Sequence, residues 1–104
     1  MRKFKINIYA DGANESDMYK MNRNKLISGM TTNPSLMKKS GIKNYKKFAK
    51  KVLKKINKKP ISFEVFADDE KNMIYQGLKI NKWGKNVYVK VPVCNSKGKF
   101  MGKV

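Results

Sequence analysis

The strongest restriction on the fold comes from a hydrophobic period that changes repeatedly along the chain. Apolar and polar side chains alternate, as in strands, around residues 4–10, 61–66 and 86–93. A shorter extended segment ends at Asn33, because Pro34 disfavours a helical conformation in the residue before it. The intervening segments have apolar residues at helical spacing. Because alternating strands and helices with short links form a parallel sheet flanked by helices, the sequence predicts an α/β fold with the order β-α-β-α-β-α-β.

The segment 44–59, NYKKFAKKVLKKINKK, has the clearest helical pattern. The apolar residues of its stripe are Tyr45, Phe48, Ala49, Val52, Leu53 and Ile56. Lysines occupy most of the other positions, so the helix could lie on a membrane or nucleic acid, or it could cover a sheet. We favour the sheet-covering interpretation, because the stripe is as wide as a core-facing helix needs.

The chain is strongly basic, with a net charge of +18 from 25 lysines and arginines against 7 aspartates and glutamates. Such a charge attracts phosphorylated metabolites and nucleic acids. Only Arg2 and Arg23 are arginines, although bidentate recognition of bases uses the guanidinium group. We therefore interpret most of the charge as a solvated lysine coat. The alternative is a small basic protein that binds nucleic acid non-specifically, which the absence of acidic residues from 18 to 63 supports.

The residue counts exclude several classes of site. Histidine is absent, which excludes histidine-activated nucleophiles and histidine metal sites, and we expect no metal. Cys94 is the single cysteine, so an internal disulfide is excluded and a reducing cytosol fits. The basic segment 1–12 has only a short, interrupted apolar run. We therefore expect no signal peptide, no membrane span and a cytoplasmic location.

One polar side chain lies near the carboxyl end of each predicted strand: Asp11, Asn33, Glu64 and Lys90. Side-chain alternation puts all four on the less apolar face of their strands, at the edge where α/β folds bind ligands. Purely structural roles remain open for each of them. Asp11 could cap the following helix, Asn33 could be only a turn residue, and Glu64 with Lys90 could form a buried ion pair.

Together these side chains could perform one specific kind of chemistry. A lysine partly desolvated among valines and aromatic residues has a lowered pKa, so the Lys90 amine could attack a ketone and form a Schiff base. The protonated imine withdraws electrons and allows a neighbouring carbon–carbon bond to break. Asp11 could exchange the hydroxyl proton at that bond, Glu64 could polarise a water, and Asn33 could bind substrate hydroxyls. We therefore interpret Lys90 as a nucleophile.

Three features of the sequence resemble the transaldolase family, including its small fructose-6-phosphate-aldolase-like members. They are TTNPS at 31–35, VYVKVPV at 87–93, and an aspartate, Asp11, at the end of the first strand. The resemblance implies a (β/α)8 barrel with Lys90 as the Schiff-base lysine, Asp11 as the acid–base group and Asn33 as a contact to dihydroxyacetone hydroxyls. Glu64 matches the glutamate of true transaldolases.

The implied reaction transfers a dihydroxyacetone unit between sugar phosphates in the pentose phosphate pathway, without a cofactor. The chain departs from the family pattern at Gly12, where a threonine or serine is usual.

Length is the larger departure, because a complete barrel takes about 250 residues. We expect residues 1–104 to form a single truncated unit, the N-terminal half of a TIM (β/α)8 barrel with four parallel strands. Such a half leaves sheet edges and an inner face uncovered. Catalysis would then require a separate C-terminal half or self-association, and the alternative is an inactive fragment.

Overall fold

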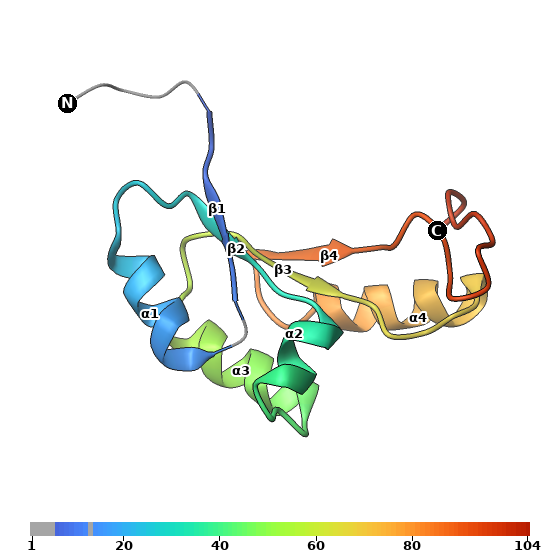
Figure 1. Cartoon of the computed structure of the whole chain (residues 1–104), viewed down its shortest axis with the longest axis horizontal. Coiled ribbons are helices and arrows are strands. Elements are labelled where there is room, and N and C mark those ends of the chain that lie inside the picture. Colours follow the sequence, from blue (N-terminus) through green and yellow to red (C-terminus); the bar gives the residue numbers. More distant parts are fainter. Residues whose placement is uncertain (1–5, 13) are drawn as a thin grey trace.

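The computed structural model describes residues 6–12 and 14–104. Within these residues, helices connect four strands, and two helices lie between the second and third strands (Figure 1). The elements are β1 (Tyr9–Asp11), α1 (Glu15–Arg23), β2 (Gly29–Thr31), α2 (Pro34–Lys39), α3 (Tyr45–Lys55), β3 (Ile61–Glu64), α4 (Glu70–Asn81) and β4 (Val87–Lys90). The predicted alternation of strands and helices is confirmed.

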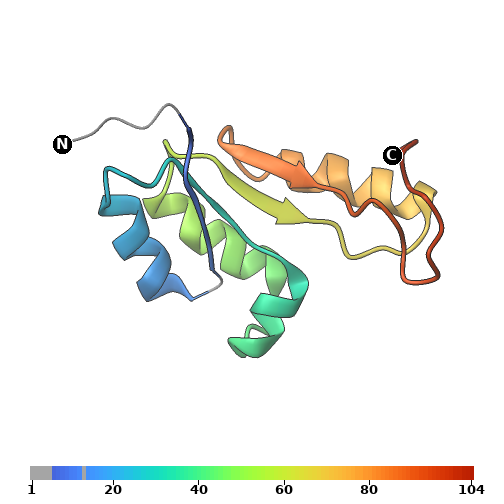
Figure 2. The ribbon, with the colours of Figure 1, turned by 45° about the horizontal axis from the view of Figure 1, so that its top comes forward.

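The four strands form one sheet in the order β1-β2-β3-β4, and every neighbouring pair is parallel. Parallel neighbours require a crossover connection, which the helices supply. All carboxyl ends therefore meet at one edge of the sheet, with β3 and β4 running side by side (Figure 2). The predicted α/β class with parallel strands is confirmed.

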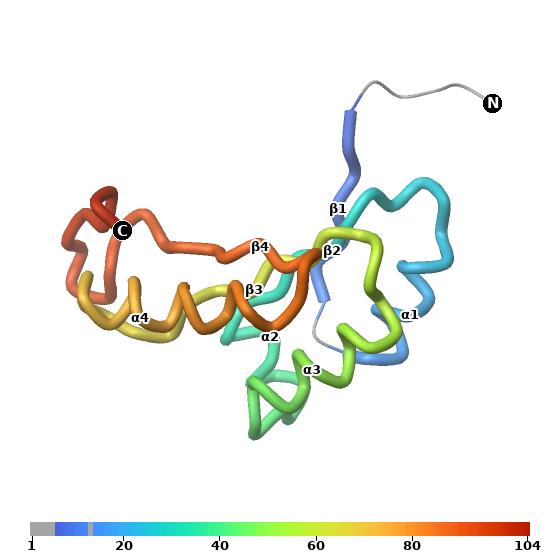
Figure 3. The backbone as a smooth tube through the Cα atoms, turned by 180° about the vertical axis from the view of Figure 1, so that it is seen from behind, coloured from blue at the N-terminus to red at the C-terminus, as the bar shows by residue number. Residues whose placement is uncertain are grey.

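The helices lie on one side of the sheet, with α3 between α1 and α4 (Figure 3). Strand residues that face them are buried, including Met30, Ile61, Phe63, Val65 and Val87. Helix α3 buries Phe48, Ala49, Val52 and Leu53 against this layer, which confirms its predicted sheet-covering role. The opposite face of the sheet, hereafter the open face, carries Tyr9, Asp11, Gly29, Thr31, Ser62, Glu64, Tyr88 and Lys90.

Each helix begins at an asparagine or aspartate that caps it. Asn14, Asn33, Asn44 and Asp69 precede α1, α2, α3 and α4, and each side-chain oxygen accepts a hydrogen bond from the amide three residues later. Such a bond satisfies one of the free amides at a helix start and contributes about 1 kcal/mol. These caps fix where each helix begins relative to the preceding strand.

Several predicted elements differ from the structure in detail. The alternating segments 61–66 and 86–93 form strands only over Ile61–Glu64 and Val87–Lys90, and β2 ends at Thr31 rather than at Asn33. The strand expected at 4–10 is shorter: β1 begins at Tyr9, and residues 4 and 5 lie outside the described part. Ile6 and Ile8 are exposed, because no helix covers that end of the edge strand. In α4, Met73 and Ile80 are buried, whereas Ile74 and Leu78 are exposed.

The segment 91–104 continues beyond β4 toward the N-terminal end of α4 and loops there (Figure 3). Cys94 and Phe100 form an isolated antiparallel bridge, and the Met101 amide donates to the Val93 carbonyl at 2.8 Å. The Met101 side chain is buried in the core. The C-terminal residues therefore pack against this unit instead of leaving β4 fully free.

Candidate active site

The register of the sheet arranges the polar side chains of the open face in two rows. In the first row, Asp11 pairs with Thr31, Thr31 with Ser62, and Ser62 with Tyr88. The Thr31 hydroxyl donates a hydrogen bond to the Asp11 carboxylate. The Ser62 hydroxyl is buried and has no hydrogen-bond partner among the described residues. The centre of this row therefore contains an unsatisfied polar group.

The second row lies two residues nearer the carboxyl ends and contains Glu64 and Lys90. These two residues are direct register partners, so their side chains emerge side by side on the open face. Both are half-buried. The Val65 amide donates to the Lys90 carbonyl at 3.1 Å, which continues the pairing of the two strands past this position.

Glu64 and Lys90 do not form the ion pair that was one sequence-based alternative. Within the described residues, the ion pair found joins Lys51 to Glu15 at 3.4 Å. The two side chains therefore start from paired backbone positions without forming an ion pair.

Asn33 follows β2, and its extended backbone (φ −155°, ψ 161°) continues the strand direction. Thr31 pairs with Ser62, and Asn33 and Glu64 each lie two residues later on their segments. Asn33 therefore belongs to the same row as Glu64. Its Oδ1 accepts a hydrogen bond from the Leu36 amide at 2.8 Å and so caps α2. The cap occupies the amide oxygen, which leaves the Nδ2 hydrogens to donate to a ligand.

Asp11 lies at the opposite edge of the sheet from Lys90. It is exposed, and it does not cap α1, because Asn14 does so. Three strand intervals separate β1 from β4, which corresponds to roughly 14 Å across the sheet. The structure therefore brings Glu64 and Lys90 together, puts Asn33 beside them, and leaves Asp11 distant.

Residues 8–103 match the transaldolase/fructose-6-phosphate aldolase family. The chain belongs to this family. It is 42% identical over 91 residues to a probable transaldolase of Leptospira biflexa, covering 85% of this chain and 40% of that protein. Probable transaldolases of Nitrosopumilus maritimus (40% identity over 88 residues, 85% and 39% covered) and Dehalococcoides mccartyi (36% over 87 residues, 84% and 40%) are similarly related.

The transaldolase-family chain spans about 40% of the length of these curated relatives. Its four parallel strands alternating with helices are part of the family's (β/α)8 architecture. In such barrels the active site lies at the carboxyl ends of the strands. That edge is where the rows of polar side chains lie in this chain.

Tyr45, which the sequence pattern assigned only to the apolar stripe of its helix, also contacts the backbone beside the candidate site. Its hydroxyl donates to the Glu64 carbonyl at 2.9 Å, and its ring lies 5.9, 4.3 and 5.4 Å from those of Phe63, Phe66 and Trp83. Burial raises the pKa of Tyr45, so the hydroxyl remains a donor. Its place at the start of a helix that runs back from the carboxyl edge is the signal that could have revealed this contact.

Two loops beside Glu64 and Lys90 are joined by a second contact. Asp68, which follows β3, accepts hydrogen bonds from the Ser96 amide at 2.7 Å and the Ser96 hydroxyl at 2.5 Å. These bonds lower the pKa of Asp68. The Asn95 side chain donates to the Asp68 carbonyl at 2.9 Å. The loops after β3 and β4 are therefore fixed relative to each other at the carboxyl edge.

In residues 6–12 and 14–104, no three cysteine, aspartate or glutamate side chains are grouped where they could hold a metal ion. No helix formed by these residues has the length and apolar character needed to cross a membrane.

Proposed function

We propose that this chain provides the Schiff-base half of a transaldolase-type active site. In this proposal Lys90 is the nucleophile, Glu64 holds and polarises a water, Asn33 binds substrate hydroxyls, and Asp11 is the acid–base group. The reaction transfers a dihydroxyacetone unit from a ketose phosphate to an aldose phosphate. Residues 1–104 act as one unit that contributes four of the eight strands of the barrel.

The observation that carries the proposal is the register pairing of Glu64 with Lys90 at the carboxyl ends of β3 and β4. A Schiff-base mechanism needs an amine beside a group that can move protons to and from a water. The register supplies both on the same face, and Tyr45 holds the backbone of β3 at that position through the Glu64 carbonyl. Membership of the family supports treating this pair as part of a site.

The first half of the proposed reaction forms an iminium ion on Lys90 and then breaks the carbon–carbon bond. The Lys90 amine adds to the ketone carbon, and the water near Glu64 relays a proton from the nitrogen to the oxygen of the adduct to form a carbinolamine. The protonated Glu64 carboxyl then donates its proton through the same water to the carbinolamine hydroxyl, which leaves as water and gives the iminium ion. Asp11 then removes the proton of the adjacent hydroxyl as the carbon–carbon bond breaks. The aldose phosphate leaves, and the electrons of the broken bond form an enamine on Lys90.

The second half of the reaction reverses these steps with another aldehyde. The enamine carbon attacks the acceptor carbonyl, and Asp11 returns its proton to the new hydroxyl. Water then adds to the iminium carbon beside Glu64, and the ketose phosphate leaves with Lys90 restored as the free amine.

This mechanism requires the open face to be covered. Asp11 lies three strands from Lys90, and Tyr9 and Tyr88 on the same face are exposed. Closing the strands into a barrel turns the inward side chains toward a common axis and removes water from around them. A separate C-terminal half of the barrel completes the site in our proposal, with pairing of two copies of this chain as the other arrangement.

Borohydride trapping tests the proposal directly. The chain, alone and mixed with the C-terminal part of a curated relative, is incubated with dihydroxyacetone or fructose 6-phosphate and reduced. We expect a dihydroxyacetone adduct on the peptide that contains Lys90. Lys90→Arg removes it, and Lys85→Arg, on an exposed lysine just before β4, retains it.

Asp11→Asn separates imine formation from bond cleavage. The variant should still trap dihydroxyacetone, because that ketone needs no carbon–carbon cleavage. It should release glyceraldehyde 3-phosphate from fructose 6-phosphate about 10²- to 10⁴-fold more slowly. If Lys90 carries no adduct under either condition, or if Lys85 is labelled equally, the catalytic assignment is wrong.

A further inference from the structure

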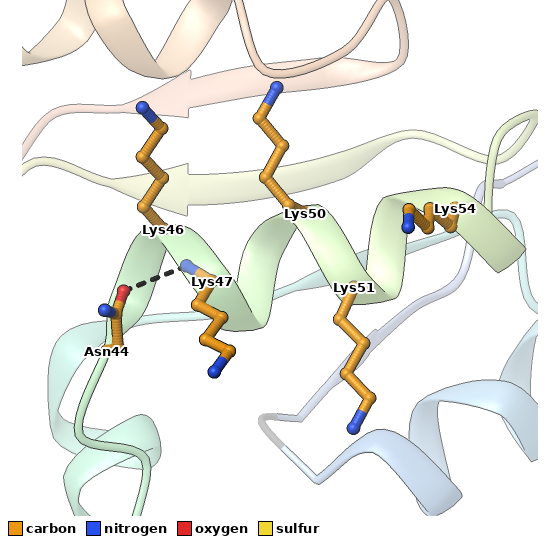
Figure 4. Close-up of a pocket in the computed structure, with 6 residues that line it drawn as sticks. All are labelled: Asn44, Lys46, Lys47, Lys50, Lys51 and Lys54. Carbon is orange, nitrogen blue, oxygen red and sulfur yellow. Dashed lines mark hydrogen bonds between the residues drawn. The ribbon is translucent and has the colours of Figure 1, made fainter.

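Helix α3 presents a continuous lysine surface to solvent. Six of its eleven residues are lysines. Five of them, with Asn44, line a shallow hollow of about 500 Å³; these are Lys46, Lys47, Lys50, Lys51 and Lys54. We call these five lysines the α3 lysine face (Figure 4).

The lysines of this face form two rows. Figure 4 shows Lys46 and Lys50 on one side of α3, and Lys47 and Lys51 on the other. Residues four apart on a helix are separated by about 6 Å along its axis. Successive phosphates of one DNA strand are displaced by about 3.4 Å along the duplex axis, so both surfaces repeat their charges every few ångströms. Each row therefore presents a line of positive charges that can contact several phosphates of one backbone.

Neighbouring lysines are already used within the fold. The Lys55 ammonium lies 4.7 Å from the centre of the Tyr19 ring, and Lys59 donates to the Asn24 carbonyl at 2.8 Å. Lys51 pairs with Glu15 at 3.4 Å. These contacts account for the lysines on the side of α3 that faces α1.

The remaining lysines of the face have no such internal role. Lys46, Lys47, Lys50 and Lys54 are exposed and have no acidic partner among the described residues. Like charges four apart on a helix destabilise it by about 0.2–0.5 kcal/mol per pair. Folding alone therefore gives no benefit from this arrangement, whereas a bound polyanion would offset the repulsion.

The chemistry of the surface indicates the kind of polyanion. The apolar side of α3 is buried against the sheet, so the helix cannot insert into a bilayer. The hollow is lined by neither arginine nor an aromatic residue, which base reading and base stacking respectively use. Lysine acts on phosphates as a point charge without reading bases. We propose that the α3 lysine face binds the phosphate backbone of duplex nucleic acid without sequence preference.

A matched pair of charge variants tests this surface. One variant carries Lys46→Gln, Lys47→Gln, Lys50→Gln and Lys54→Gln. The control removes the same amount of charge elsewhere with Lys71→Gln, Lys82→Gln, Lys85→Gln and Lys97→Gln, all at exposed positions. Glutamine keeps a similar helix propensity to lysine, and circular dichroism verifies that both variants fold.

Affinity for a labelled DNA duplex is then measured by fluorescence anisotropy over a range of salt concentrations. Each neutralised phosphate contributes about 0.9 to the slope of log affinity against log salt. The α3 variant should lower that slope by about 3 to 4, and the control by less than about 1. Equal losses in both variants would show a diffuse charge effect and overturn the proposal.

Two further probes distinguish the ligand class. Tighter binding to single-stranded than to duplex DNA would contradict the choice of a duplex backbone. Binding to phosphatidylserine vesicles without binding to the duplex would assign the face to membranes instead. Neither result depends on Lys90, so this test is independent of the Schiff-base proposal.

Discussion

The two faces of the sheet are formed by the same four strands but differ in how far their side chains are exposed to solvent. On the face covered by helices, Ile61 and Phe63 are 0% exposed. On the open face, Tyr9 and Tyr88 are 47% and 65% exposed. Side chains alternate between the two faces at every residue, so one sequence pattern defines both.

The difference between the faces separates stability from chemistry. The covered face excludes water, and its apolar burial provides the main driving force for folding. The open face holds Glu64 and Lys90 side by side and leaves the Ser62 hydroxyl without a partner among the described residues. Mutations on the two faces should therefore have effects of different size and kind.

Truncation of Phe63 should give the largest effect. Its ring is fully buried and contacts the rings of Tyr45 and Trp83. Phe63→Ala should lower the free energy of unfolding by about 3–5 kcal/mol, because it loses apolar burial and leaves a cavity. Urea denaturation followed by circular dichroism measures this loss.

Tyr88→Ala is the control on the open face of β4. Its ring is mostly exposed, so the free energy of unfolding should change by less than about 1 kcal/mol. Similar losses for Phe63→Ala and Tyr88→Ala would show that the open face is covered in solution and that the comparison fails.

Gly29 is an exception on the open face, and it should give the second-largest effect. The Tyr9 ring lies across it, so a Cβ at position 29 would come within 2.5 Å of Tyr9 Cε2 and 2.7 Å of the Pro60 carbonyl oxygen. Gly29→Ala should lower the free energy of unfolding by about 1–3 kcal/mol through overpacking. Thermal and urea unfolding measure the change.

Gly12→Ala is the matched control, because among the described residues a Cβ there would meet only Met18 Cγ, at 3.5 Å. It should change stability by between zero and a gain of about 1 kcal/mol. In Gly29→Ala combined with Tyr9→Ala, the clash with the Pro60 carbonyl should remain. Full recovery in the double variant would assign the whole penalty to the tyrosine ring and refute a backbone contribution.

The division into two faces could be predicted from the sequence because it depends on local alternation. Ser62 and Glu64 against Ile61 and Phe63 show the period of two directly, and the stripe around Phe48 predicts the covering role of α3. The positions of all four candidate site residues on strand ends follow from the same pattern. Their catalytic roles stay predictions.

The lateral arrangement of the site could not be predicted in this way. Alternation places Asp11 and Lys90 on the same face, but the number of strands between them depends on strand order. The bond from Tyr45 to the Glu64 carbonyl depends on how α3 lies on the sheet. Alternation puts Ile6 and Ile8 on the same face as Ala10, yet both are exposed, because β1 is an edge strand of the sheet.

The contact between the loops after β3 and β4 should give the smallest effect, and that effect should depend on pH. Hydrogen bonds from Ser96 lower the pKa of Asp68. The folded state therefore binds this proton less readily than the unfolded state, so the contact stabilises the fold above the unfolded-state pKa. That stabilisation is lost as the pH falls through the lower, folded-state pKa.

Ser96→Ala should therefore reduce stability slightly at neutral pH, and its difference from the native chain should shrink in acid. Urea unfolding at several pH values measures the difference, and the carboxyl ¹³C shift of Asp68 should show its pKa rising toward the usual range in the variant. Ser35→Ala, at an exposed position in α2, should leave both quantities unchanged. An unaltered Asp68 pKa in Ser96→Ala would mean that the loops beside Glu64 and Lys90 are not joined in solution. The loops after β3 and β4 would then be free to move relative to each other at the carboxyl edge of the open face.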